Sequence, residues 1–161
     1  MNIVQSASPP STRLSTAPVR HPNATFRETD YEKVWAGYSG QGGLSRLRDL
    51  VQQINRSTYI QSGNSCTSIL RRAHRGQVIA FPLRTDLWLP NFQFVGDNFE
   101  ILPGIAKALE EFQGTLNPLE IALWFCTPTV WLQNQSPMQV VAAAPDAVHA
   151  AARADRYIVS G

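Results

Sequence analysis

Few side chains in this sequence could act as a nucleophile, a base or a metal ligand, and those present are widely separated. His21, His74 and His149 lie in different segments, and none has a carboxylate or cysteine at the spacing of a metal site. Cys66 and Cys126 fit neither a zinc-binding pattern nor the disulfide framework of a small secreted protein. We therefore expect no metal, no cofactor and a reducing, cytoplasmic setting.

The adjacent Glu110 and Glu111 come nearest to a pair of catalytic carboxylates. Neighbouring residues on a helix point about 100° apart, so these two side chains are poorly placed to act as acid and base on one substrate. The sequence accordingly predicts a binding protein and not an enzyme.

An arginine-rich segment is more informative, because it could contact nucleic acid. Arg71, Arg72, His74 and Arg75 crowd the end of a predicted helix that runs into a predicted strand. Arginines so placed can contact phosphates or guanine in the major groove, as in a winged-helix protein. Helix C-termini also attract cations through the helix dipole, so a purely structural role stays open. The segment is the candidate contact with operator DNA.

Charge is distributed unevenly along the chain, although the net charge is only +2. Residues 44–75 hold six arginines against one aspartate, whereas residues 86–120 hold one lysine against six acidic residues. This separation of charge says more about possible partners than the total does. No apolar run is long enough to cross a bilayer, so no membrane partner is expected.

In the first half of the chain, most of the elements expected to hold the candidate side chains are helices. Apolar residues recur there at helical spacing, while charged residues take the opposite face. Helices are expected over residues 31–38, 44–54 and 65–74. A strand at 77–81, bounded by Pro82, and a second extended stretch at 87–95 predict a hairpin.

In the second half, proline recurs where the first turn of a helix is expected and its missing N–H costs nothing. Helices should begin at Pro103, Pro118, Pro137 and Pro145, and the last should run to Arg153. Asn117 and Glu120 stand in the order of a capping box around Pro118. The predicted fold class is mainly α with a small β-hairpin, an α+β fold.

Three regions follow from this pattern. Residues 1–25, rich in Ser, Thr and Pro, predict a disordered arm, and their prolines oppose the alternative of an amphipathic transit peptide. Residues 26–82 predict a helical module that resembles a degenerate helix-turn-helix. Residues 83–161 predict a second helical domain.

An ordered set of short motifs lies in the part of the chain from about Thr67 to the C-terminus. Residues 124–141 read WFCTPTVWLQNQSPMQVV, and IAFP, LPNFQF and ILPGIA precede them at 79–82, 89–94 and 101–106. This ordered set resembles the toxin-binding domain of the Xre/MbcA/ParS antitoxins, in which a Trp-Leu-x-Thr-Pro-Asn turn precedes a leucine, a glycine and a Ser/Thr-Pro. The departures are Phe125, Thr129 and Asn134, which replace leucine, asparagine and glycine.

The resemblance implies the antitoxin of a type II toxin–antitoxin module. Such a protein binds a cognate toxin, often a RES-type, NAD-consuming enzyme, covers its active site and regulates its own operon as a dimer. The motif residues are Trp124, Pro128, Trp131, Leu132 and Pro137. Their alternative role is to build the helical core.

The end of the chain is the expected contact surface. Arg153, Asp155, Arg156 and Tyr157 combine charge with an aromatic anchor, as binding hot spots do. A competing hypothesis is a winged-helix-like, DNA-binding transcriptional regulator with no toxin partner, for which the basic segment would be the working surface.

Overall fold

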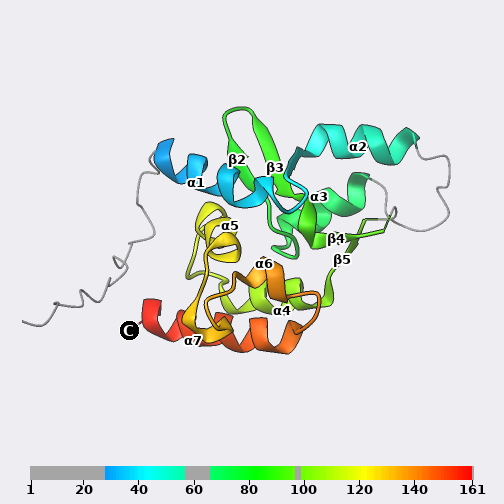
Figure 1. The fold of residues 1–161 in the computed structure, drawn as a ribbon. Coiled ribbons are helices and arrows are strands. Elements are labelled where there is room, and N and C mark those ends of the chain that lie inside the picture. The colour runs from blue at the N-terminus through cyan, green and yellow to red at the C-terminus, as the bar shows by residue number, and fades with distance from the viewer. Residues whose placement is uncertain (1–27, 57–65, 97–98, 161) are drawn as a thin grey trace, which may run out of the picture.

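The computed structural model describes residues 28–56, 66–96 and 99–160 (Figure 1). Its first elements are α1 (Glu28–Ser39), β1 (Leu44–Arg46), α2 (Leu47–Arg56), α3 (Cys66–His74), β2 (Phe81–Leu83), β3 (Asp86–Pro90), η1 (Asn91–Gln93), β4 (Phe94–Val95) and β5 (Glu100–Ile101). They are followed by α4 (Pro103–Glu111), α5 (Pro118–Cys126), η2 (Val130–Leu132), α6 (Pro137–Val140) and α7 (Pro145–Ser160). The α+β class is confirmed, since helices dominate beside small antiparallel sheets. The predicted disordered arm at 1–25 lies outside the described residues.

The three-stranded sheet has the order β1-β3-β2, with antiparallel pairs throughout. Trp88, in the central strand, is opposite Arg46 on one side and Phe81 on the other. A hairpin of β2 and β3 is therefore present, although its strands have other limits than the predicted 77–81 and 87–95, and β1 adds a third strand to it. The sheet joins strands on both sides of the domain boundary expected at 82–83.

Two hydrophobic cores lie on opposite faces of this sheet. Successive residues of a strand point to opposite faces, so Trp88 packs against the larger core while Leu89 belongs to the smaller one. The larger core is built mainly from α1, α4, α5 and α7 around Phe112 and Phe125. Residues from α2 and α3, including Leu50 and Ile69, form the smaller core. The sheet is thus a shared wall between the two.

The predicted strand at 77–81 was wrong over most of its length, because β2 begins only at Phe81. Val78 and Ile79 are buried, but neither pairs with a strand among the residues that the structure describes. The side chain of Gln93 takes the place of a strand: its Oε1 accepts from Ile79 N at 2.7 Å, and its Nε2 donates to Ile79 O at 3.0 Å. Gln93 also donates to Pro90 O at 2.9 Å and is fully buried.

The helix expected over 44–54 also begins later than predicted. Residues 44–46 form β1, which pairs with β3, and α2 starts at Leu47. A helical pattern of apolar residues could not reveal this, because the partner strand lies more than forty residues away in the sequence.

The proline-initiated helices of the second half begin where expected. At the start of α5, the Asn117 side chain accepts from Leu119 N and Glu120 N, and Glu120 accepts from Asn117 N. That is the predicted capping box. The last helix is longer than predicted, since α7 continues beyond Arg153 to Ser160.

Close approaches between helices fix the arrangement in Figure 1. A Cβ built on Gly37 of α1 would lie 2.8 Å from Cys126 Sγ of α5, and Tyr38 Oη donates to Ala122 O at 2.6 Å. A Cβ on Gly104 of α4 would lie 2.8 Å from Pro145 Cβ at the start of α7. Consequently α1 and the β2–β3 hairpin lie at one end of the molecule, and α7 lies at the other. No helix in the described ranges is both long and apolar enough to span a membrane.

Candidate partner-binding site

The candidate site begins with Trp124, which α5 directs toward α7. Its ring packs edge-on against Phe112 at 4.8 Å and against Phe125 at 4.9 Å between centroids. Its indole Nε1 donates to Asp155 Oδ2 of α7 at 2.6 Å. Trp124 is therefore half-buried and links two helices, which is the structural alternative that the motif left open.

The turn after α5 presents Val130 and Trp131 to solvent. An isolated bridge pairs Thr129 with Gln135, and η2 lies between them. Leu132 is buried, while Val130 and Trp131 are 75% and 52% exposed.

Two residues after η2, Gln133 and Asn134, have φ values of 56° and 62°. Asparagine tolerates this left-handed conformation better than most side chains. Asn134 is therefore suited to its left-handed position in this turn.

Asp155 holds the exposed indole in place. Trp131 Nε1 donates to Asp155 Oδ1 at 2.8 Å, so one carboxylate accepts from the indoles of both Trp124 and Trp131. Hydrogen bonds to an ionised acceptor are stronger than those between neutral groups. The exposed ring of Trp131 is therefore held in one orientation by α7.

Glu111 at the end of α4 makes a second set of contacts with α7. His149 Nε2 lies 2.9 Å from Glu111 Oε1, Arg153 Nε donates to that oxygen at 3.3 Å, and Arg156 donates to Oε2 at 3.1 Å. Partial burial acts to raise the pKa of Glu111, but these hydrogen bonds outweigh it and lower the pKa below its ordinary value. The carboxylate is consequently ionised at neutral pH.

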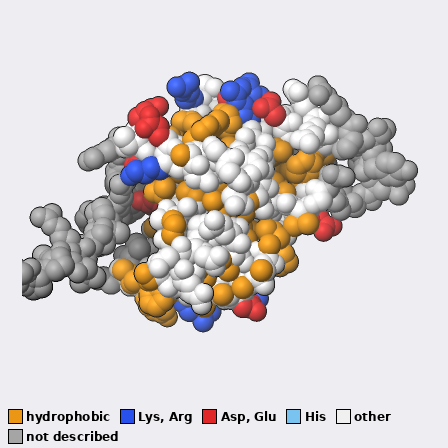
Figure 2. Space-filling model, viewed as in Figure 1, with side chains coloured by type: hydrophobic (Ala, Val, Ile, Leu, Met, Phe, Trp, Pro, Cys, Tyr) orange, Lys and Arg blue, Asp and Glu red, His pale blue; other side chains and the backbone are white. Residues whose placement is uncertain are grey.

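The predicted contact residues of α7 thus divide into two groups. Arg153 and Arg156 are directed toward Glu111, although both side chains remain about half exposed. Tyr157 is 73% exposed, and Ile158, which the sequence analysis did not select, is 63% exposed. Figure 2 shows hydrophobic side chains at the lower left, over this end of α7. Below, Val130, Trp131, Tyr157 and Ile158 are called the C-terminal apolar patch.

The other motif residues have mixed positions. Leu132 and Pro137 are buried, whereas Pro128 is exposed. Glu111 was not predicted to anchor α7, although the sequence of α7 contains a signal for it. His149, Arg153 and Arg156 follow the i, i+4, i+7 spacing of one helix face, but that face becomes visible only when the helix is extended past Arg153.

The predicted nucleic-acid residues lie together at the C-terminal end of α3. Arg71, His74 and Arg75 are exposed and Arg72 is half-buried. None of the four pairs with an acidic side chain within the described part of the chain. The link from α2 to α3 is nine residues long, which is longer than the three to four residues typical of a helix-turn-helix.

Groups that could carry chemistry are poorly placed for it. Burial raises the pKa of the Cys126 thiol to about 11, so little nucleophilic thiolate forms at neutral pH. Over the residues described, His, Cys, Asp and Glu side chains form no group of three suited to a metal ion.

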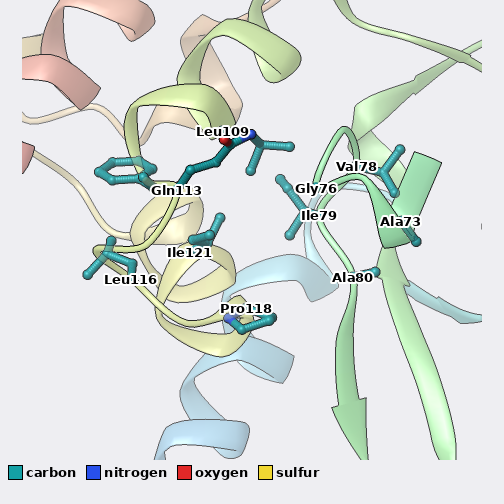
Figure 3. Close-up of a pocket in the computed structure, with 11 residues that line it drawn as sticks. Ala73, Gly76, Val78, Ile79, Ala80, Leu109, Gln113, Leu116, Pro118 and Ile121 are labelled. Atoms are coloured by element: carbon teal, nitrogen blue, oxygen red, sulfur yellow. The ribbon is translucent and has the colours of Figure 1, made fainter. Parts of the chain in front are cut away.

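An apolar cavity of about 120 Å³ lies between the end of α3 and the α4–α5 pair (Figure 3). Ala73, Val78 and Ile79 face Leu109 and Ile121 across it. Among the described lining residues Gln113 is the polar side chain, and none is titratable. The cavity has no groups for acid–base chemistry.

Comparisons with protein-family models, curated proteins and solved structures find no match to this chain.

Proposed function

We propose that this protein is the antitoxin of a type II toxin–antitoxin module and neutralises a cognate toxin by covering its active site. The observation that carries the proposal is the C-terminal apolar patch: Asp155 of α7 accepts from the exposed Trp131 of η2, and Tyr157 and Ile158 are exposed on the following turn of α7. The patch lies within the domain that resembles the toxin-binding domain of the Xre/MbcA/ParS family. DNA regulation would use the end of α3 in the first half of the chain, and toxin binding would use η2 and α7 in the second half.

The patch has the composition of a binding hot spot. Tryptophan and tyrosine supply large contact areas with few rotatable bonds, so little conformational entropy is lost when a partner binds. Here the indole of Trp131 is already fixed by Asp155. Preorganisation of this kind raises affinity, because the side-chain entropy is lost on folding and not on binding.

Arg153 and Arg156 take a supporting role in this proposal. Their ion pairs with Glu111 hold α7 against α4 and so set the position of Tyr157 and Ile158. The toxin surface opposite the patch should therefore be a mainly apolar cleft, not an acidic one.

A growth assay tests the proposal. The protein would be co-expressed with the product of the adjacent gene, as wild type and as the double variant Tyr157→Ser plus Ile158→Ser. We expect the wild type to co-purify with that product and to restore growth, and the double variant to lose both properties. Deletion from Ala150 onward would be less informative, since Ala151 and Ala152 are buried in the core.

Val95→Ser is the matched control, because Val95 is also exposed but lies in β4, away from the patch. It should co-purify and restore growth like the wild type. Absence of any complex between the wild-type protein and the adjacent gene product would contradict the antitoxin proposal.

A DNA-binding regulator is the second candidate, and one observation favours it. The arginines at the end of α3 are not neutralised by acidic neighbours within the described ranges, so their charge is available to phosphates. Duplex binding that weakens with salt and is lost in Arg71→Ala plus Arg72→Ala would support this function. The same double variant should leave toxin neutralisation intact.

A further inference from the structure

A second exposed aromatic surface lies at the opposite end of the molecule from α7. Trp35 of α1 is 48% exposed, and its ring meets the edge of Trp88 of β3 at 5.0 Å between centroids. The guanidinium of Arg46 lies over the Trp88 ring, 5.0 Å from its centroid. A stacked arginine and two packed indoles form a rigid platform, not a loose surface side chain.

Charges of opposite sign flank this platform. On α1, Glu28 and Glu32 precede Trp35 at the i, i+4, i+7 spacing of one helix face, and both are exposed. On the hairpin, Arg84 is exposed at the turn between β2 and β3. None of these three charged side chains has an ion-pair partner among the residues that the structure describes.

The neighbouring charges reinforce the separation. Arg46 and Arg48 share the single carboxylate of Asp86, at 3.8 and 3.1 Å, which leaves the hairpin side with excess positive charge. Lys33 pairs with the buried Asp30 at 3.9 Å, on the flank of α1. Figure 2 shows hydrophobic side chains near the top, with acidic side chains where α1 begins and basic side chains over the hairpin; a further basic side chain lies below the start of α1, and a further acidic one lies beside the basic side chains at the top.

We propose that this surface binds a second copy of the same chain about a two-fold axis near Trp35. In a two-fold interface the same patch meets itself, so each acidic side meets the partner's basic side. Glu28 and Glu32 of one copy would then face Arg84 of the other, twice per dimer. The paired indoles would fill the centre, from which water is excluded.

In this dimer the α7 end of each protomer stays accessible to solvent. The C-terminal apolar patch lies at the α7 end, away from the proposed two-fold axis (Figure 1). A dimer of this kind therefore presents two such patches pointing away from each other. The inference does not rest on the proposed function.

Sedimentation analysis of the purified full chain tests the interface. We expect a dimer for the wild type, with a dissociation constant that rises with salt because part of the attraction is ionic. Trp35→Ala should raise the dissociation constant by roughly tenfold or more, because a tryptophan at the centre of an interface contributes much of the binding energy. Val95→Ala, at an equally exposed valine outside the surface, should leave it unchanged.

A charge-swap experiment separates this pairing from any other mode of association. Glu28→Arg plus Glu32→Arg makes both sides of the surface basic, whereas Arg84→Glu makes both sides acidic. Each variant alone should be monomeric, because identical charges then face each other across the axis. An equimolar mixture of the two should form a one-to-one dimer, since every contact is again between opposite charges.

Three results would overturn the proposal. They are a monomeric wild-type chain, a dimer that Trp35→Ala leaves intact, and a mixture of the two charge variants that stays monomeric. Circular dichroism of each variant confirms that it is folded, and the exposed positions of all five substituted residues make this the expected outcome.

Discussion

Gln93 shows how one buried side chain can replace an element of secondary structure. It binds both the N–H and the C=O of Ile79, which would otherwise be buried without partners. Each such orphaned backbone group costs about 1–3 kcal/mol. The glutamine between Phe92 and Phe94 therefore has a structural role that its type alone does not reveal.

Gln93→Leu should destabilise the fold, because leucine has a similar volume but no hydrogen-bonding groups. We expect a loss of about 3 kcal/mol or more, because the N–H and C=O of Ile79 become unpaired and Pro90 O loses a donor; chemical denaturation measures this loss. Gln52→Leu, at an exposed position of α2, is the control and should change the stability little. Equal stability of the two variants would show that Ile79 finds other partners.

Glu111 gives a prediction that depends on pH. Its folded pKa lies below the ordinary value of 4.5, so it stabilises the fold fully above about pH 4.5 and loses this contribution as the pH falls through the folded pKa. Glu111→Gln should therefore be less stable than the wild type at neutral pH. The difference should shrink below pH 4.5. Unfolding curves across this range measure it, with the exposed neighbour Glu110→Gln as the control.

At the scale of elements, two glycines decide how closely helices approach. Gly104 lies in the segment ILPGIA, and a Cβ there would meet Val141 Cγ2 and Pro145 Cβ at 2.8 Å. Contacts this short cannot be relieved without moving α4 or the α6–α7 junction. The need for glycine at this position is thus a packing requirement and not a turn requirement.

Gly104→Ala should destabilise the protein by about 1–3 kcal/mol, the usual cost of overpacking, despite the better helix propensity of alanine. Gly40→Ala provides the matched control, because a Cβ there meets no atom within 4 Å. Thermal unfolding of the two variants measures the difference. A Gly104→Ala protein as stable as the control would refute the close approach.

Helix starts were predictable in the second half because their signals are local. Asn117, Pro118 and Glu120 act within one turn of α5, so the sequence alone located the capping box. Strand limits were not predictable in the same way. Whether Leu44 and Ile79 are extended, paired or free depends on β3 and Gln93, which lie far along the chain.

The candidate site was predictable only in part for the same reason. The motif identified Trp124 and Trp131, but not the carboxylate of Asp155 that joins them across more than twenty residues. Likewise, the sequence marked Arg153 and Arg156 as charged and near the end of the chain. It could not show that both are directed toward Glu111 in another helix.

At the scale of the whole molecule, the sheet couples two cores that share little else. Trp88 packs into one core and Leu89, its neighbour in β3, packs into the other. Loss of either core exposes one face of β3 to solvent. The described part of the chain should therefore unfold as one cooperative unit.

Leu89→Ala tests this coupling. Leu89 is fully buried, so the substitution should cost about 2–5 kcal/mol. Transitions followed by tryptophan fluorescence, which reports mainly on the larger core, and by far-ultraviolet circular dichroism should shift together. Separate transitions for the two probes would show that the cores unfold independently.

The intrinsic fluorescence of the four tryptophans can also report on binding. Trp35 and Trp131 are about half exposed at opposite ends, while Trp88 and Trp124 are more deeply packed beside them. An indole that leaves water emits at shorter wavelength, so each end reports separately when it becomes covered. Comparing the emission shift of the single variants Trp35→Phe and Trp131→Phe on binding would therefore show, without an added label, which end a partner covers.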